Sequence, residues 1–296
     1  MSWVEAELKE GKFSDKRLKS RFLTIVSQLF DKMGSSIPMD CQDWANTKAA
    51  YRFFSNPNLT EEEILADHFQ STKSRFNTTE GPVLVLHNTT EMTYKRDDPT
   101  TIGYTRKCGN RKGLFDQVAK RAMCGVLMHS SLVLTLEGVP LGFSAKKFWN
   151  RDKFKDAKSL YRKKNATRIP IEEKESYRWL EGVRNSNLLL GDPSRLIHIG
   201  DREADIYELF HSAESGNSKY LVRIKVNRRT DEESKTIQNV LNEADVQGKI
   251  EISYRDKEGE LVAAILEIKC KSSILHVCQV LWGGLEGQLA PPIQKV

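Results

Sequence analysis

The sequence predicts an α/β protein with a mixed sheet, and three changes of pattern along the chain predict this class. Residues 1–75 carry apolar residues at helical spacing. From residue 82 the apolar residues form short blocks of strand type, separated by helical stretches. From Lys219 the pattern alternates as in β-strands. We therefore expect a helical N-terminal domain over 1–75, a core of strands and helices over 76–218, and a β-rich part over 219–296.

The helical part predicts three helices. One has its apolar face at Leu18, Phe22, Leu23, Val26 and Leu29, and Ser14 or Asp15 can cap it. A second covers Asp43 to Phe54, because Asn56-Pro57 stops it. A third begins at Thr60, since Glu63 three residues later completes a capping box.

The pattern of residues over 76–218 predicts alternating strands and helices. A short strand covers residues 82–86 and a loop covers 95–116. Glu137-Gly138 joins two strands as a hairpin, and the charged stretch 151–166 is expected to be exposed. The expected elements are strands at 122–136, 140–148 and 195–200 and helices at 172–190 and 203–211. In the last part we expect strands at 220–226, 249–254, 261–268 and 274–282, with a turn at 256–259.

Bulk composition narrows the class of protein. Of 296 residues, 39% are hydrophobic and 29% are charged, as in soluble globular proteins. No run of about 18 apolar residues predicts a membrane span, and the N-terminus lacks the plan of a signal peptide, so we expect a cytoplasmic protein. The five cysteines show no C-x-x-C pair, which argues against a zinc site or a disulfide framework. The net charge of +6 falls in recurring basic clusters, and these suit a polyanion better than a small substrate.

The chemistry-bearing feature is an acidic group that follows a buried strand. Asp201-Arg202-Glu203 comes directly after the apolar run that ends at Gly200. In α/β sheets, ligands and metals bind at the carboxyl ends of strands. Asp201 therefore has two interpretations from its position alone: a carboxylate ligand for Mg²⁺, or the N-cap of the following helix.

Two stretches resemble the catalytic strand motifs of bacterial cut-and-paste DDE transposases, most closely those of the insertion-sequence-four family. They are Val85-Leu-His-Asn-Thr-Thr-Glu-Met-Thr-Tyr94 and Gly200-Asp-Arg-Glu-Ala-Asp-Ile-Tyr207. Phe13-Ser-Asp-Lys-Arg-Leu18 and Ala50-Tyr-Arg-Phe-Phe-Ser-Asn-Pro57 are similar to the end-binding domain of that family. The resemblance implies an RNase H-like mixed-sheet core, a partial β-rich insertion over 219–296, and Mg²⁺ or Mn²⁺ bound by three acids. It also implies double-stranded DNA at transposon ends as the partner.

The sequence departs from the family pattern at two of the three acids. Asn88 stands where the family has its first aspartate, beside Asp201 as the second. An amide oxygen lacks the negative charge of a carboxylate, so we expect weakened metal binding. The third acid belongs to a Tyr-Arg-Glu-Lys-type motif that the 296 residues do not contain. We therefore expect a transposase that is catalytically impaired on its own.

Basic residues in three places are the expected DNA contacts. Their guanidinium and ammonium groups suit phosphate oxygens, and they are Lys16, Arg17, Lys19, Arg21, Arg52, Arg202, Arg223, Lys225, Arg228 and Arg229. Strand alternation would put Arg223 and Lys225 on one face. Rival hypotheses are a transposase completed by a second polypeptide, a DNA-binding regulator that inhibits intact transposase, and a decayed remnant. Protein partners would then be a second copy or an intact transposase, and no membrane.

Overall fold

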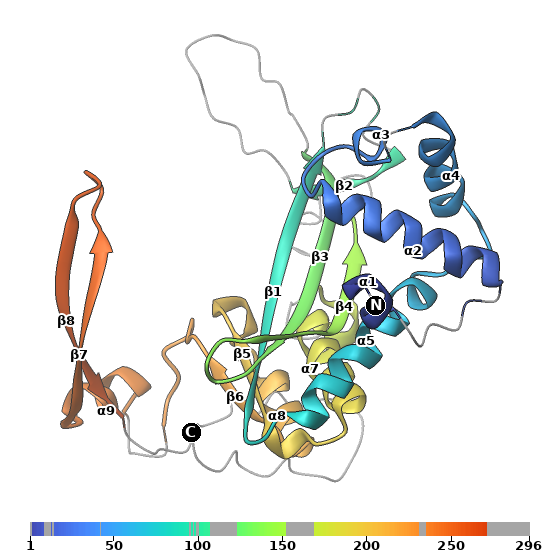
Figure 1. The fold of residues 1–296 in the computed structure, drawn as a ribbon. Helices are drawn as coiled ribbons and strands as arrows, with labels where there is room; N and C mark the ends of the chain where they lie inside the picture. Colours follow the sequence, from blue (N-terminus) through green and yellow to red (C-terminus); the bar gives the residue numbers. More distant parts are fainter. Residues whose placement is uncertain are drawn as a thin grey trace.

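The computed structural model describes residues 2–8, 13, 15–41, 43–94, 96, 98, 101–106, 123–151, 169–230 and 235–270. They form a mixed α/β structure with a six-stranded mixed sheet, helices, and a separate two-stranded sheet (Figure 1). Within these ranges, the helices are too short or too polar to cross a membrane. The expected α/β class with a mixed sheet is confirmed.

The N-terminal helices begin where their capping residues predict. They are α1 (Trp3–Glu7), α2 (Lys16–Asp31), α3 (Ile37–Asp40), α4 (Trp44–Phe54) and α5 (Glu61–Thr78). Asp15 and Asp43 cap α2 and α4 through their carboxylates, and Thr60 forms the predicted capping box with Glu63 at α5. A buried cluster from α1, α2, α4 and the segment between them joins these helices: Val4, Leu8, Phe22, Ile25, Cys41, Ala50 and Phe53.

The main sheet is antiparallel on one side and parallel on the other. Its strands are β1 (Val83–Tyr94), β2 (Tyr104–Arg106), β3 (Met123–Leu134), β4 (Pro140–Trp149), β5 (Leu196–Gly200) and β6 (Lys219–Val222). The order is β2-β3-β1-β5-β6, and β4 also pairs with β3. β1 runs antiparallel to β3 and parallel to β5, which runs parallel to β6. The predicted hairpin is the β3–β4 pair, and Gly138 supplies its positive φ of 85°.

Two helices cover one face of this sheet. Phe76 of α5 and Leu190 of α7 (Tyr177–Leu190) pack on Val83, Val85 and neighbouring strand residues. Since side chains alternate along a strand, Leu84 and Leu86 belong to the opposite face. The short helices η3 (Ile171–Glu173) and η4 (Pro193–Arg195) flank α7, which is shorter than the predicted helix over 172–190.

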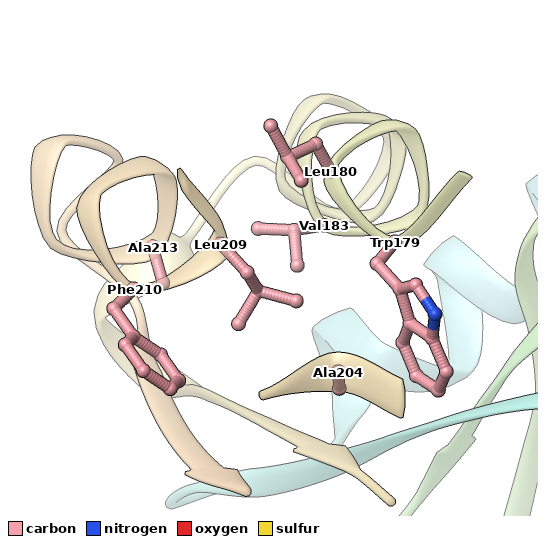
Figure 2. Packing of buried hydrophobic residues seen from close by; sticks show 7 residues of the cluster. All are labelled: Trp179, Leu180, Val183, Ala204, Leu209, Phe210 and Ala213. Atoms are coloured by element: carbon pink, nitrogen blue, oxygen red, sulfur yellow. The ribbon is translucent and has the colours of Figure 1, made fainter. Parts of the chain in front are cut away.

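A second buried cluster fixes the segment that follows β5. There η5 (Arg202–Ala204) leads into α8 (Tyr207–Ser215), where the sequence predicted one helix over 203–211. Figure 2 shows Ala204 of η5 lying between Trp179 and Val183 of α7 and Leu209 of α8. The cluster as a whole comprises Trp179, Leu180, Val183, Ala204, Leu209, Phe210 and Ala213. The residues after Asp201 are thus held by the core.

Four expectations about strands and helices were wrong. β1 continues from residue 86 to Tyr94, because its polar half pairs with β3 through the register His87↔Ser131 to Tyr94↔Cys124. β6 ends at Val222 and lies in the main sheet, so Arg223 and Lys225 do not share a strand face. α9 (Ile237–Glu243), capped by Thr236, lies in a part where only strands were expected. The predicted loop over 95–116 contains β2.

The remaining described elements form an amphipathic hairpin. β7 (Val246–Arg255) and β8 (Leu261–Lys269) pair antiparallel on either side of the predicted turn. The predicted stretches 151–166 and 274–282 fall outside the described residues, apart from Arg151.

Candidate functional site

The parallel strands bring three residues of interest level with one another. Leu86 pairs with Ile199, and Ile199 pairs with Leu221. The parallel pairing ends at Leu86 and at Gly200, and continuing its register would place Asn88, Asp201 and Arg223 level with one another. The Arg223 amide donates to the Gly200 carbonyl at 3.1 Å and so extends the ladder towards this row. Asn88, Asp201 and Arg223 are all exposed. The structure therefore brings the two predicted metal ligands, and one predicted DNA contact, to one edge of the sheet.

Asp201 is held in place by a tight turn. Its Oδ1 accepts from the Glu203 amide at 2.8 Å, so the N-cap interpretation is confirmed for η5. The turn needs glycine at position 200, because a Cβ there would lie 2.4 Å from the Cβ of Ala204. Ala204 is fully buried in the cluster of Figure 2. One carboxylate oxygen is thus used by the turn, which leaves the exposed carboxylate able to bind a further group through its other oxygen.

Arg178 of α7 connects the motif that contains Asn88 with the motif that contains Asp201. This α7 residue is only 8% exposed. Its Nε donates to Thr89 Oγ1 at 3.1 Å, next to Asn88, and its Nη2 pairs with the Glu203 carboxylate, next to Asp201. Its Nη1 also donates to the Glu175 carbonyl at 2.7 Å. Arg178 therefore fixes the spacing of the two motifs, which the sequence did not indicate because its three partners lie on different elements.

A layer of buried histidines lies beneath the same edge. His87 Nε2 lies 2.8 Å from His198 Nδ1, and Ser131 Oγ lies 2.8 Å from His87 Nδ1. Burial lowers the pKa of His198 to about 4. Burial, and to a smaller extent the positive charges of Arg178 and Lys147, lowers the pKa of His129 to about 3. These histidines are neutral at pH 7, and both His87 and His198 are buried in the core.

The donor set at this edge is small. Asn88 offers a neutral carbonyl oxygen and Asp201 a carboxylate, and no group of three or more His, Cys, Asp or Glu residues in the described ranges is arranged to hold a metal ion. Mg²⁺ prefers six oxygen ligands and keeps waters where the protein supplies few. A single hydrated divalent ion fits two such donors, whereas a pair of metal ions with only one carboxylate between them does not.

A basic surface covers the beginning of α2. Lys16 and Arg17 are exposed, and Lys19 and Arg21 are half-buried. Arg21 Nη1 donates to Asn46 Oδ1 at 3.1 Å, which ties α2 to the first turn of α4. Arg21 thus has a role in joining the two helices, whereas Lys16 and Arg17 point their charges to solvent.

The adjoining helix α4 exposes an aromatic and basic face. Trp44 is 78% exposed and Tyr51 is 52% exposed, and Lys48 and Arg52 are exposed beside them. These four residues stand at i, i+4, i+7 and i+8, the spacing of one helix face. The opposite face packs through Ala50 and Phe53. Aromatic residues are enriched at interfaces, and a basic helix face is a common footprint of DNA binding.

The third group of basic residues lies on the segment after β6. Arg223, Lys225 and Arg229 are exposed. Arg228 points inward instead, where its guanidinium pairs with Asp205 and lies 5.6 Å from the ring centre of Phe210. Arg202 is exposed in η5 beside Asp201. Asp205 was not predicted as a site residue, although it lies four residues after Asp201 in the same motif and could have been selected on that ground.

One family model matches the N-terminal helices. Residues 1–59 match the model of a family described as transposase DNA-binding. This range contains the basic surface of α2 and the exposed face of α4, so the N-terminal region resembles the DNA-binding regions of transposases. Among solved structures, the chain is similar to the Mos1 transposase paired-end complex with left transposon end, at 9% identity and a TM-score of 0.24. That similarity covers 72% of this chain and 60% of the Mos1 chain.

Proposed function

We propose that this chain is a transposase-type protein that binds the double-stranded DNA of transposon ends. The observation that carries the proposal is the match of residues 1–59 to the transposase DNA-binding family. Within that range, α2 and α4 expose the basic and aromatic residues that such binding needs. The proposal includes the finer assignment to DDE transposases similar to the insertion-sequence-four family, with an RNase H-like core.

In this proposal the N-terminal helices recognise the end sequence. The exposed face of α4 enters a groove of the duplex, where Trp44 and Tyr51 contact bases or sugars. Lys48 and Arg52 contact phosphates beside them, as do Lys16 and Arg17 on α2. Phosphate contacts fix the orientation of the helix, and contacts to base edges supply sequence preference.

We propose that the DNA backbone contacts the core at Asn88, Asp201 and Arg223, which we call the strand-end row. Arg223 and Asp201 lie level there, so a phosphate could approach between a cation and a divalent ion. Mg²⁺ or Mn²⁺ would supply charge neutralisation at Asp201 and Asn88. With one carboxylate rather than two, the ion would be held weakly. We therefore propose that the chain as it stands binds DNA ends but is impaired in cutting them.

A regulatory role is the second candidate, and Asn88 favours it. A chain that occupies transposon ends without cutting them would compete with an intact transposase for the same DNA. It could also pair with an intact copy in a mixed complex. Either behaviour would make it an inhibitor of transposition, in the cytoplasm where the DNA is.

The test is binding to a labelled duplex that carries the terminal repeat flanking the coding sequence. A scrambled duplex of equal length and composition is the control. Fluorescence anisotropy should show tighter binding to the repeat, and the difference should reach about a thousandfold if recognition is fully specific. The double variant Lys48→Ala, Arg52→Ala should weaken binding to both duplexes, because it removes phosphate contacts. Lys219→Ala, an exposed basic residue at the far end of β6, should leave both unchanged. Equal wild-type affinity for the two duplexes would refute end recognition.

A further inference from the structure

We propose that Asp205 is a positioning residue, which clamps the segment Arg223–Arg229 so that Arg223 and Lys225 face the DNA backbone beside Asp201. Arg228, in this proposal, is part of the clamp and not a DNA contact. The inference rests on the proposed DNA binding and deepens it, since it says which basic residues of the core form the phosphate track.

Asp205 is a carboxylate fully removed from solvent. Its side chain has 0% exposure, and it lies between η5 and α8 at the edge of the core cluster. A buried carboxylate is stable only when its oxygens are paired or hydrogen-bonded. The partners of Asp205 therefore show what the residue is there to hold.

Every partner of Asp205 lies on the segment after β6. Its Oδ2 accepts from the backbone amides of Lys225 and Val226, at 2.6 and 2.9 Å. Its Oδ1 pairs with the Arg228 guanidinium, and its backbone carbonyl accepts from Arg228 Nη2 at 3.0 Å. A single carboxylate thus bends the chain back at residues 225–226 and secures it again at residue 228.

The clamp determines which side chains are available to a ligand. Because the guanidinium of Arg228 is bound to Asp205 and packs on Phe210, its charge is compensated inside the protein. The amides of Lys225 and Val226 point inward, while the side chains of Lys225 and Arg223 are exposed. The exposed positive charges of the segment therefore lie at Arg223, Lys225 and Arg229, and of these Arg223 lies next to Asp201.

The sequence spacing places the clamp close to the site. Asp205 follows Asp201 by four residues, and η5 between them is fixed by the burial of Ala204. Arg223 hydrogen-bonds through its amide to Gly200, immediately before Asp201. The turn that orients Asp201 and the clamp that orients Arg223 are consecutive parts of one short segment, so the two side chains keep a fixed spacing.

The experiment combines DNA binding with proteolysis of the full chain. Binding to a duplex of arbitrary sequence is measured as a function of salt, since each phosphate contact adds about 0.9 to the slope of log K against log salt. Asp205→Asn, which is nearly isosteric but lacks the negative charge that pairs with the Arg228 guanidinium, should lower the slope by about 2. It should also expose new tryptic cleavage within residues 223–229. Glu214→Gln, an exposed carboxylate on α8, is the control and should change neither result.

Arg228 separates the clamp from a direct contact. In the wild-type background, Arg228→Gln should open the clamp and therefore give new tryptic cleavage within residues 223–229. A loss of about 1 in the slope without new cleavage would show that Arg228 binds phosphate and would overturn the proposal. An unchanged slope in Asp205→Asn, together with new tryptic cleavage, would overturn it as well.

A second variant keeps the test decisive if Asp205→Asn does not fold. The double variant Arg223→Ala, Lys225→Ala leaves the clamp intact and should lower the slope by about 2 without new cleavage. An unchanged slope in this variant would refute the phosphate track. Because the duplex is of arbitrary sequence, loss of preference for terminal repeats would refute end recognition and leave these results standing.

Discussion

Gly182 in α7 is predicted to resist replacement by alanine, although alanine is the better helix former. A Cβ at position 182 would lie 2.9 Å from His87 Nδ1 and 3.2 Å from Ser131 Oγ. Distances below 3.0 Å require something to shift, and neither neighbour is free to do so. His87 is held between Ser131 and His198 by two hydrogen bonds of 2.8 Å, and it is 5% exposed.

The magnitude follows from three contributions. Alanine gains about 1 kcal/mol over glycine in a helix interior. Overpacking of a tight core costs about 1–3 kcal/mol, and disruption of the His87–Ser131 hydrogen bond costs ~1 kcal/mol more. The net expectation for Gly182→Ala is a loss of roughly 1–3 kcal/mol in the free energy of unfolding.

Urea denaturation followed by circular dichroism measures this difference. Asn185→Ala, on the exposed side of the same helix, is the matched control and should gain a few tenths of a kcal/mol. A Gly182→Ala protein as stable as the wild type would refute the reasoning, because it would show that α7 can move away from β1 at no cost.

Three further outcomes are expected. Burial lowers the pKa of His129 to about 3 and that of His198 to about 4, below the unfolded value of ~6.5. The unfolded chain therefore binds more protons than the folded chain at pH values between the folded and unfolded pKa. Stability should therefore be fully present above the unfolded value and should fall with pH below it, by about 2.5 kcal/mol per unit near pH 5; a flat profile from pH 7 to 5 would contradict this. Asn88→Asp should raise Mn²⁺ affinity measured by calorimetry roughly thirtyfold, since a carboxylate ~4 Å from a divalent ion adds about 2 kcal/mol even at the dielectric constant of water; the further change Asp201→Asn should reverse the gain, and no gain would argue against a metal site at this edge. Trp44→Ala should leave the melting temperature unchanged, because the side chain is 78% exposed, and should weaken DNA binding in anisotropy measurements; unchanged affinity would remove α4 from the interface.

Local signals in the sequence were enough for much of the framework. Asp15, Asp43 and Thr60 begin their helices because a short polar side chain can accept the free amides of a first turn, and this chemistry involves only neighbouring residues. The β3–β4 hairpin could be predicted from Gly138, because the positive φ of a tight turn is also a local property of the chain. The resemblance of two short motifs directed attention to Asn88 and Asp201, which the parallel register then placed level.

Pairing between distant strands lay beyond these signals. The sequence ended β1 near residue 86, where the apolar run stops, but residues 87–94 form ladder hydrogen bonds with β3 some forty positions away. A strand was predicted over residues 220–226, but β6 ends at Val222. The chain leaves the sheet there because Asp205 accepts hydrogen bonds from the amides of Lys225 and Val226. Such competition between a sheet edge and a buried carboxylate is decided by three-dimensional packing.

By itself, the sequence determined which residue types are present: a carboxylate at Asp201, an amide at Asn88 where the family that the motif resembles has an aspartate, and basic clusters along the chain. Only the tertiary structure decided how those residues are used. It divided the basic residues into exposed ones, such as Lys16 and Arg223, and Arg228, whose charge is compensated by Asp205. The physical reason is that the sequence gives the charge of each side chain directly. Burial and ion pairing decide what that charge can bind, and both depend on neighbours that only folding brings together.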